Sequence, residues 1–366
     1  MTDVDSICGA ITYAYTRTYT SVPLTFHIPL TNIPRSDVAL RTELTPVFAK
    51  AGIDASEIIT LSDLPALEER SMKLPASRTR WILVDHNALT GELAQDYAGS
   101  IVGCIDHHDE ENKVPKDCGH EPRVIEKSGS CTSLIVEECR KHDQWDVIDS
   151  SSSIPFAWLA LGPILIDTQS LTSMHKVTDH DIASANALEL VLGASHVDYD
   201  RQKYYGDIHN AKEDIGHLNI YDILRKDYKQ WDESATAGCK LDIGISSTVK
   251  PLPFLIAKAG GVPNLMTEID IFSAERGLSI ISIMTSYTSE AGEYSRELFV
   301  MGRDAAGVEA LRRFEERNVE VLKLEKSVFG LDNDDDEDCG VCRAWFQRAT
   351  EASRKQVAPL LRLAAV

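Results

Sequence analysis

A carboxylate and two imidazoles follow one apolar run of the sequence. Ile101 to Ile105 is typical of a buried strand, and Asp106, His107 and His108 come directly after it. In an α/β protein the carboxyl end of a strand is where ligand-binding groups normally lie. Carboxylate and imidazole are good ligands for divalent metals, and a neighbouring acid can fix the tautomer of a histidine. The run suits a divalent metal site, but taken alone it also suits a solvated turn.

A second strand ends in the same way. Trp81 to Val84 predicts a short buried strand, and it is followed by Asp85, His86 and Asn87. If the two strands are neighbours in one parallel sheet, their ends face the same crevice. The repeated Asp-His pattern therefore favours the metal site over the turn.

Three more acids stand at helix ends. Asp3 and Asp5 precede a helix expected over Ile7–Tyr15, and they can either cap that helix or hold a metal. Asp167 follows the apolar run Ile154–Ile166, which predicts a buried helix and is too short to span a membrane. An acid at the end of a buried helix is costly to desolvate unless it is paired or metal-bound, which supports a ligand role for Asp167.

The small residues from Ser128 to Ser133 precede a helical run that extends to Arg140. Hydroxyl residues at a helix start usually cap the helix. Free backbone N–H groups at such a start can also receive a phosphate. The sequence leaves both interpretations open.

Composition indicates a globular protein with room for two domains. The chain has 366 residues, of which 43% are hydrophobic and 26% are charged. No apolar run is long enough for a membrane span and no targeting segment is recognisable, so we expect a cytoplasmic protein that binds no membrane. The formal net charge of -20 argues against a nucleic-acid binder. It leaves an anionic substrate possible, because bound cations and a few Lys and Arg residues can make a cleft locally positive.

The cysteines and the acidic run near the C-terminus carry less chemistry. The eight cysteines are scattered in the way of buried thiols, and only Cys339 and Cys342 form a CxxC pair. Without a second pair, a solvated loop is favoured there over a structural zinc. Asp332 to Asp338 is an acidic run that we expect to be solvated, because it lacks the spacing of a calcium loop.

Several elements must position these residues. In the first half we expect a strand over residues 23–30 and a helix over Arg35–Ala51 that ends at Gly52. The chain becomes polar after residue 195, which predicts a first domain over residues 1–195, a linker helix over 196–215 and a second domain over 216–366. In the second domain the expected strands are Leu241–Val249, Leu265–Phe272, Leu278–Thr285 and Glu297–Met301, and the expected helices are Pro253–Gly260 and Ala306–Leu324. Pro359 is expected to break the element that follows Arg354 and Lys355.

The acidic motifs together resemble a known family. Asp3-x-Asp5-Ser6, Val84-Asp85-His86-Asn87, Asp106-His107-His108 and Ile166-Asp167-Thr168 have the order and approximate spacing seen in the DHH phosphoesterase superfamily. The ending SRKQVAP and the segment RKDYK are similar to the DHHA2 domain of its second subfamily, which holds family II inorganic pyrophosphatases, exopolyphosphatases and prune-like proteins. The segments LALGPILIDTQSLT and LRKDYKQW look most like the fungal exopolyphosphatases.

The resemblance implies an α/β fold and a function. It implies an N-terminal, mostly parallel sheet with flanking helices, a smaller C-terminal α/β DHHA2 domain, and an active site in the cleft between them. The implied activity is hydrolysis of terminal phosphoanhydride bonds of inorganic polyphosphate by a monomeric enzyme with two divalent cations, Mn²⁺ or Mg²⁺. The alternatives are an inorganic pyrophosphatase and a prune-like binding or regulatory protein with weak activity.

The resemblance also implies roles for particular residues. The implied metal ligands are Asp3, Asp5, Asp85, His107 and Asp167. Asp106 would orient a neighbouring histidine, and His108 would face the substrate phosphate. The implied phosphate-binding cations of the second domain are Lys229, Arg354 and Lys355.

One departure from the family pattern concerns the N-terminus. Members carry an apolar strand and a further polar residue upstream of the DxD motif, and Met1-Thr2 leaves no room for them. The sequence therefore predicts a sheet without its first strand. We expect a form with an added upstream strand to be more stable and more active than this chain.

Overall fold

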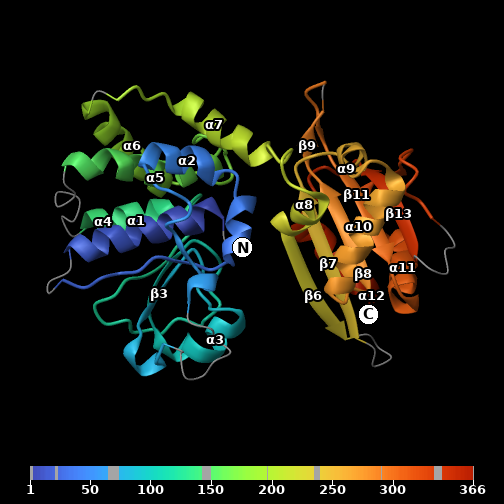
Figure 1. The fold of residues 1–366 in the computed structure, drawn as a ribbon, viewed down its shortest axis with the longest axis horizontal. Helices are drawn as coiled ribbons and strands as arrows, with labels where there is room; N and C mark the ends of the chain where they lie inside the picture. The colour runs from blue at the N-terminus through green and yellow to red at the C-terminus, as the bar shows by residue number, and fades with distance from the viewer. Residues whose placement is uncertain are drawn as a thin grey trace. The chain divides into compact units, whose positions relative to one another are not determined.

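The computed structural model describes residues 3–20, 24–64, 74–141, 150–195, 197–234, 240–289, 291–333 and 340–365. The chain divides into two compact units, Met1–Asp214 and Ile215–Val366 (Figure 1). Each unit combines helices with a β-sheet, so the expected mixed α/β fold is confirmed. None of the helices in these ranges is long and apolar enough to cross a membrane.

The first unit contains two small parallel sheets. Strands β3 (Trp81–Val84), β4 (Ile101–Asp106) and β5 (Arg123–Ile125) form one sheet in that order. Strands β1 (Leu30–Thr31) and β2 (Ile59–Thr60) form the other. The prediction that the Trp81 and Ile101 strands are adjacent and parallel is therefore confirmed, and their carboxyl ends lie at the same edge of the sheet.

The described part of this unit also contains seven α-helices. They are α1 (Val4–Thr20), α2 (Leu44–Ala51), α3 (Gly91–Tyr97), α4 (Cys131–Lys141), α5 (Ser150–Asp167), α6 (Asp179–Ala194) and α7 (Arg201–Glu213). Short 3₁₀ helices occupy Arg35–Leu40, Leu61–Asp63, Ala76–Arg78 and Ala98–Ser100. The apolar run of α5 lies at the centre of the larger core, against α1, α2, α6 and α7. The buried helix expected there is confirmed.

Helices α1 and α4 lie side by side in Figure 1. Gly9 of α1 makes their close approach possible, because a Cβ atom at Gly9 would stand 2.8 Å from Ile135 Cδ1 and 3.2 Å from Thr132 Oγ1. The same two helices pack on β3 and β4 through a second cluster that includes Tyr13 and Ile105. This packing brings the first turn of α1 to the first turn of α4.

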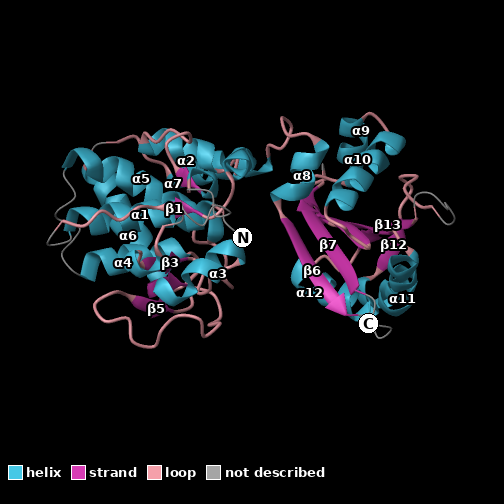
Figure 2. Cartoon of the chain, turned by 60° about the horizontal axis from the view of Figure 1, so that its bottom comes forward, coloured by secondary structure: helices cyan, strands magenta, loops and turns pink. Residues whose placement is uncertain are grey.

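The second unit contains one six-stranded mixed sheet in the order β12-β13-β11-β8-β7-β6. Its strands are β6 (Tyr228–Ser234), β7 (Lys240–Thr248), β8 (Ile280–Thr285), β11 (Glu297–Gly302), β12 (Leu324–Lys326) and β13 (Val341–Gln347), and a separate hairpin pairs β9 (Tyr287–Thr288) with β10 (Tyr294–Ser295). Its helices are α8 (Ile220–Lys226), α9 (Leu252–Ala259), α10 (Val262–Glu275), α11 (Ala305–Leu322) and α12 (Arg354–Ala365). Helices α8 to α10 pack together and α11 packs on α12, and both groups contact the sheet (Figure 2).

Two of the expected strands are wrong. Residues 24–29 form no strand, and Phe26 is 76% exposed, because the segment has no sheet neighbour until Leu30 pairs with Ile59. The run Leu265–Phe272 is part of helix α10, since Leu265, Ile269 and Phe272 repeat at helical spacing and all are fully buried. The first run therefore lacks a strand partner, and the second has the period of a helix rather than that of a strand.

Two further expectations need correction. The helix expected over Arg35–Ala51 is a 3₁₀ helix followed by α2, with Arg41–Glu43 between them and Gly52 in the left-handed conformation at the end. Pro359 does not break its element, because α12 continues through it to Ala365. The missing proline N–H would have faced the carbonyl of the exposed residue Lys355, so its loss is inexpensive.

The cysteine and acidic segments are described only in part. Residues 334–338 of the acidic run and Cys339 of the CxxC pair lie outside the described residues. Cys342 is a buried residue of β13, and its thiol donates to the carbonyl of Leu331 at 3.0 Å.

Candidate metal centre

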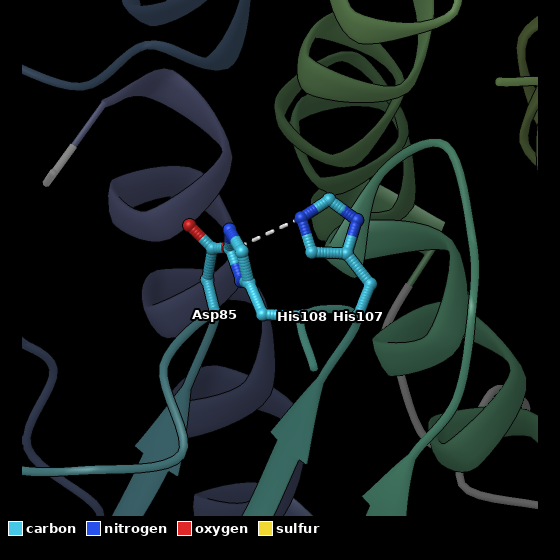
Figure 3. A group of neighbouring side chains, drawn as sticks. All are labelled: Asp85, His107 and His108. Atoms are coloured by element: carbon cyan, nitrogen blue, oxygen red, sulfur yellow. Dashed lines mark ion pairs between the residues drawn. The ribbon is translucent and has the colours of Figure 1, made fainter. Parts of the chain in front are cut away.

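The ends of two adjacent strands bring Asp85, His107 and His108 together (Figure 3). Asp85 follows β3, and the two histidines follow β4 directly after Asp106. Nε2 of His107 lies 3.3 Å from Oδ1 of Asp85, and Nδ1 of His108 lies 3.8 Å from the same oxygen. Among the residues that the structure describes, this is the one group of at least three acids, histidines or cysteines with converging metal-ligand atoms.

Asp85 has an unfavourable backbone conformation and a buried carboxylate. Its φ angle is +61°, a left-handed conformation that L-residues other than glycine seldom adopt. The residue is 3% exposed, and Ser6 Oγ donates to its Oδ2 at 2.5 Å. Its other oxygen, Oδ1, is buried and receives no hydrogen bond from the described part of the chain. A buried carboxylate oxygen without a donor, facing two imidazoles, is an acceptor for a cation.

The hydrogen bonds of the two histidines decide which nitrogen is available. His107 Nδ1 lies 3.0 Å from the carbonyl of Ser128, which can only accept, so Nδ1 carries the proton and Nε2 faces Asp85. Burial lowers the pKa of His107, but the carboxylates of Asp85 and Asp5 and the Ser128 carbonyl outweigh it and raise this pKa to about 9. A cation bound to Asp85 would take the place of the proton on Nε2.

His108 differs from His107 in exposure and in partner. Its Nδ1 lies 2.8 Å from Asp106 Oδ1, and its side chain is 58% exposed. With Nδ1 committed to Asp106, the nitrogen left for another partner is Nε2, which points away from that carboxylate. His108 is therefore arranged to meet a ligand from solvent rather than to share the cation with His107.

Asp106 and Asn87 form the support for His108. Asp106 is fully buried, and its Oδ1 also accepts from the backbone N–H groups of His107 and His108. Its Oδ2 accepts from Asn87 Nδ2 at 2.5 Å, and Asn87 Oδ1 accepts from the backbone N–H of Glu111. Although burial raises the pKa of Asp106, these bonds outweigh it and lower the pKa below its usual value, so the residue is a stable anion.

Asp5 lies on the N-terminus of α4. Its Oδ1 accepts from Ser130 Oγ, Thr132 N and Thr132 Oγ1, and its Oδ2 accepts from Cys131 N at 2.7 Å. The N–H groups at this helix start therefore bind a side-chain carboxylate rather than lying free for a phosphate. Because Oδ2 accepts one hydrogen bond from the described residues, it keeps a lone pair for a cation.

Asp3 and Asp167 are electrostatically coupled to Asp5. Asp3 caps α1 by accepting from the N–H groups of Asp5 and Ser6. Burial raises the pKa values of Asp3, Asp5 and Asp167, and the neighbouring acids raise these values further. Crowded carboxylates with raised pKa values are unfavourable unless a positive charge is present.

The three expected phosphate-binding cations all belong to the second unit. The Arg354 side chain binds the Asp227 carboxylate at 2.7 Å and the Asp227 carbonyl at 2.9 Å. Lys229 is an exposed residue of β6 two positions after Asp227, and Lys355 is exposed beside Arg354. Arg354 thus lies at the start of β6, and the contact of all three cations with a substrate stays a prediction.

Sequence reasoning missed the residues that support the ligands. In the sequence Asn87 is part of a motif and Ser6 part of the DxDS run, and neither position alone indicates a supporting role. For Asp181, on α6, the sequence offers only the capping pattern Thr178-x-x-Asp181, which marks a helix start. No local signal shows that this carboxylate also reaches residues fifty positions earlier in the chain.

The residues present fit a divalent cation. The orphaned Oδ1 of Asp85, Nε2 of His107 and the free lone pair of Asp5 Oδ2 are donors of the types that Mn²⁺, Mg²⁺ and Zn²⁺ accept. The excess of buried acids over bases around them supplies the charge that such an ion neutralises.

Family models match most of the chain in two parts. The model "DHH family, N-terminal domain" matches residues 1–158, and the model "DHHA2 domain" matches residues 206–364. A Schizosaccharomyces pombe protein named "Putative exopolyphosphatase" is 32% identical over 98% of this chain and 87% of that protein. The human protein "Exopolyphosphatase PRUNE1" is 25% identical over 98% of this chain and 72% of its own length.

A solved structure agrees with the fold. The Methanococcus jannaschii "putative family II inorganic pyrophosphatase" aligns with 99% of this chain and 96% of its own chain, at a TM-score of 0.55 and 22% identity. The two-part α/β architecture is thus shared with a solved protein.

Proposed function

Because this chain belongs to the DHH family of phosphoesterases, with a DHHA2 domain after the DHH domain, we propose that it hydrolyses terminal phosphoanhydride bonds of inorganic polyphosphate and releases orthophosphate. The S. pombe relative, matched over nearly the whole chain, carries the name exopolyphosphatase, and so does the human relative. These names support the choice of substrate.

One observation carries the chemistry. The buried Oδ1 of Asp85 accepts no hydrogen bond from the residues that the structure describes, and it faces His107 Nε2 at the end of two parallel strands. That arrangement supports a hydrolase that depends on a divalent cation. In the proposal the protein binds two divalent ions, either Mn²⁺ or Mg²⁺. Their ligands are Asp3, Asp5, Asp85, His107 and Asp167.

Bound divalent cations supply Lewis acidity toward water and the phosphoryl oxygens. The chain's own residues do the rest. Asp85 and His107 fix the ion positions, while Asp106 holds His108 so that Nε2 can bind a phosphoryl oxygen. Lys229, Arg354 and Lys355 bind further phosphate oxygens. Catalysis in this proposal then rests on positioning and charge stabilisation rather than on a nucleophile from the protein.

Phosphate release from a panel of substrates tests the proposal. The purified chain is assayed with Mn²⁺, Mg²⁺ and Co²⁺ on pyrophosphate, tripolyphosphate and long-chain polyphosphate. We expect orthophosphate release from polyphosphate that EDTA abolishes and added metal restores. His107→Ala should reduce the rate at least about a hundredfold, since Lewis-acid stabilisation contributes several kcal/mol. Asp179→Asn, an exposed acid on α6, is the matched control and should leave the rate unchanged.

The other results are equally informative. Faster turnover of pyrophosphate than of polyphosphate would replace the proposal with a pyrophosphatase. No turnover of any substrate with any metal would favour a prune-like binding protein. Full activity in His107→Ala would place the activity elsewhere or in a contaminant.

A further inference from the structure

Asp181 lies behind the candidate metal centre and has no assigned role. It is a fully buried residue in the first turn of α6. Six donors in the described residues bind its carboxylate: Ser128 Oγ, Ser130 N and Ser133 Oγ at Oδ1, and Gly129 N, Thr178 N and Thr178 Oγ1 at Oδ2. Burial alone would raise its pKa, yet these bonds lower it, so Asp181 is an anion in the folded protein.

The donors come from three places: the capping box of α6, the loop before α4, and Ser133 of α4 itself. Thr178 belongs to the capping box of α6, which is a local structural role. Ser128, Gly129 and Ser130 form the loop between β5 and α4, and their bonds to Asp181 measure 2.9–3.1 Å. We call these three residues the 128–130 loop. Asp181 therefore holds this loop through three hydrogen bonds.

The 128–130 loop touches both kinds of candidate ligand. The carbonyl of Ser128 lies 3.0 Å from Nδ1 of His107, and the hydroxyl of Ser130 donates to Asp5 at 2.8 Å. Gly129 sits between them with no room for a side chain, because a Cβ atom there would stand 2.7 Å from Thr168 Cγ2 and 2.9 Å from Asp181 Oδ2. A loop packed this tightly transmits the position of Asp181 to both ligands.

We propose that Asp181 is a positioning residue for the metal centre, which acts through the 128–130 loop to set the ring of His107 and the carboxylate of Asp5 together. The inference rests on the proposed metal dependence. Supporting residues that orient metal ligands commonly change metal affinity by about ten- to a hundredfold when they are lost.

Asp181→Asn is the principal variant, because it keeps the volume and removes the charge. Whichever way the amide is turned, its NH₂ group replaces one oxygen and faces three donors that had bound that oxygen. Asp179→Asn on the same turn of α6 is the matched control, since Asp179 is exposed. Two properties of the full-length proteins are measured: the Mn²⁺ dissociation constant by calorimetry, and the hydrogen exchange of backbone amides 129–132 in the metal-free state.

We expect Asp181→Asn to weaken Mn²⁺ binding at least about tenfold and to speed exchange at residues 129–132, with Asp179→Asn like the parent. An unchanged Mn²⁺ affinity and unchanged exchange in a folded Asp181→Asn protein would overturn the inference. The exchange measurement needs no metal. A parent protein that binds no Mn²⁺ but shows the exchange effect therefore refutes the proposed function while leaving the positioning of the loop standing.

A second pair of variants decides the case where Asp181→Asn does not fold. Ser133→Ala removes a bond between α4 and Asp181 that lies outside the loop, whereas Gly129→Ala displaces the loop itself. We expect Gly129→Ala to weaken Mn²⁺ binding and Ser133→Ala to lower only the melting temperature. Equal losses of Mn²⁺ affinity in the two variants would show that Asp181 contributes stability alone, and the inference would be wrong.

Discussion

The residue that carries the most strain in the candidate site is Asp85. It combines a left-handed backbone with a buried charge and an oxygen that accepts no hydrogen bond within the described ranges. Each of these features costs free energy of folding, on the order of 1–3 kcal/mol for the backbone conformation alone. Its charge also contributes to raising the pKa of Asp5. Such costs are expected where a residue is retained for binding rather than for stability.

Asp85→Asn should separate stability from binding. Asparagine tolerates the left-handed conformation, and the substitution removes a negative charge from a cluster of acids. We expect the metal-free variant to melt at the same temperature as the parent or higher. Added Mn²⁺ should raise the melting temperature of the parent and leave that of the variant unchanged. Scanning calorimetry with EDTA and with Mn²⁺ measures both effects, and a variant that Mn²⁺ stabilises as much as the parent would contradict the assignment of Asp85.

The cations of the second unit differ in what else they bind. Lys355 is exposed, whereas Arg354 binds Asp227 through its carboxylate and its carbonyl. Lys355→Gln should raise KM for polyphosphate about tenfold without changing the melting temperature, since a hydrogen bond to a charged group contributes ~1.5 kcal/mol. Arg354→Gln should raise KM and also lower the melting temperature, because Asp227 loses its partner. Steady-state kinetics and thermal melts of the two variants measure these effects, and Lys127→Gln, at an exposed lysine, is the control. A constant KM in both variants would contradict the assignment.

At the scale of elements, the N-terminus of α4 organises the centre. Its first N–H groups bind Asp5, the preceding loop binds Asp181, and Gly9 lets α1 approach closely enough for Asp5 to reach it. Negative charge is favourable at a helix N-terminus, so α4 stabilises an acid that burial would otherwise disfavour. The helix start that could have bound a substrate phosphate thus holds a side chain of the chain itself.

The tie between α6 and α4 predicts a pH dependence of stability. Because the folded-state pKa of Asp181 lies below its ordinary value near 3.8, its contribution is complete above that value and is lost as pH falls through the lower folded pKa. Asp181→Asn should therefore lower the free energy of unfolding by about 2 kcal/mol or more at pH 7, and by progressively less below about pH 4. Urea denaturation at pH 7 and pH 3 checks this. A difference that stays constant with pH, or one shared by Asp179→Asn, would contradict it.

At the scale of the whole molecule, the acids and the cations are divided between the two units. All five expected metal ligands lie in the unit Met1–Asp214, and all three expected phosphate-binding cations lie in the unit Ile215–Val366. In the proposed function the first set binds the cations and the second set binds phosphate oxygens. Metal and phosphate are therefore expected to act on different parts of the chain.

Hydrogen exchange of the full chain tests this division. Mn²⁺ alone should protect the first turns of α1 and α4 and the ends of β3 and β4, and it should leave unit Ile215–Val366 unchanged. Mn²⁺ with orthophosphate should add protection around Lys229 and Arg354. Asp85→Asn is the control and should show neither response. Protection of Lys229 and Arg354 by Mn²⁺ alone, or none with orthophosphate, would contradict the division.

Local sequence patterns predicted most of the elements that carry the ligands. The strands Trp81–Val84 and Ile101–Asp106 and the buried helix that ends at Asp167 are confirmed. The prediction failed for two apolar runs that were expected to be strands. The exposed run 24–29 has no neighbouring strand, and α10 buries Leu265, Ile269 and Phe272 at helical spacing. Whether a short apolar run becomes strand or helix depends on its partners, which a local pattern does not contain.

The sequence by itself determined which chemical groups are available: carboxylates and imidazoles directly after two buried strands, and acids at two helix ends. The tertiary structure alone decided how they are held. It turned His107 by the carbonyl of Ser128, committed His108 to Asp106, and put Asp5 on the N-terminus of α4 with Asp181 behind the same loop. The reason is that residue type fixes what an atom can donate or accept, whereas a hydrogen bond between residues fifty or more positions apart exists only after packing has brought them together.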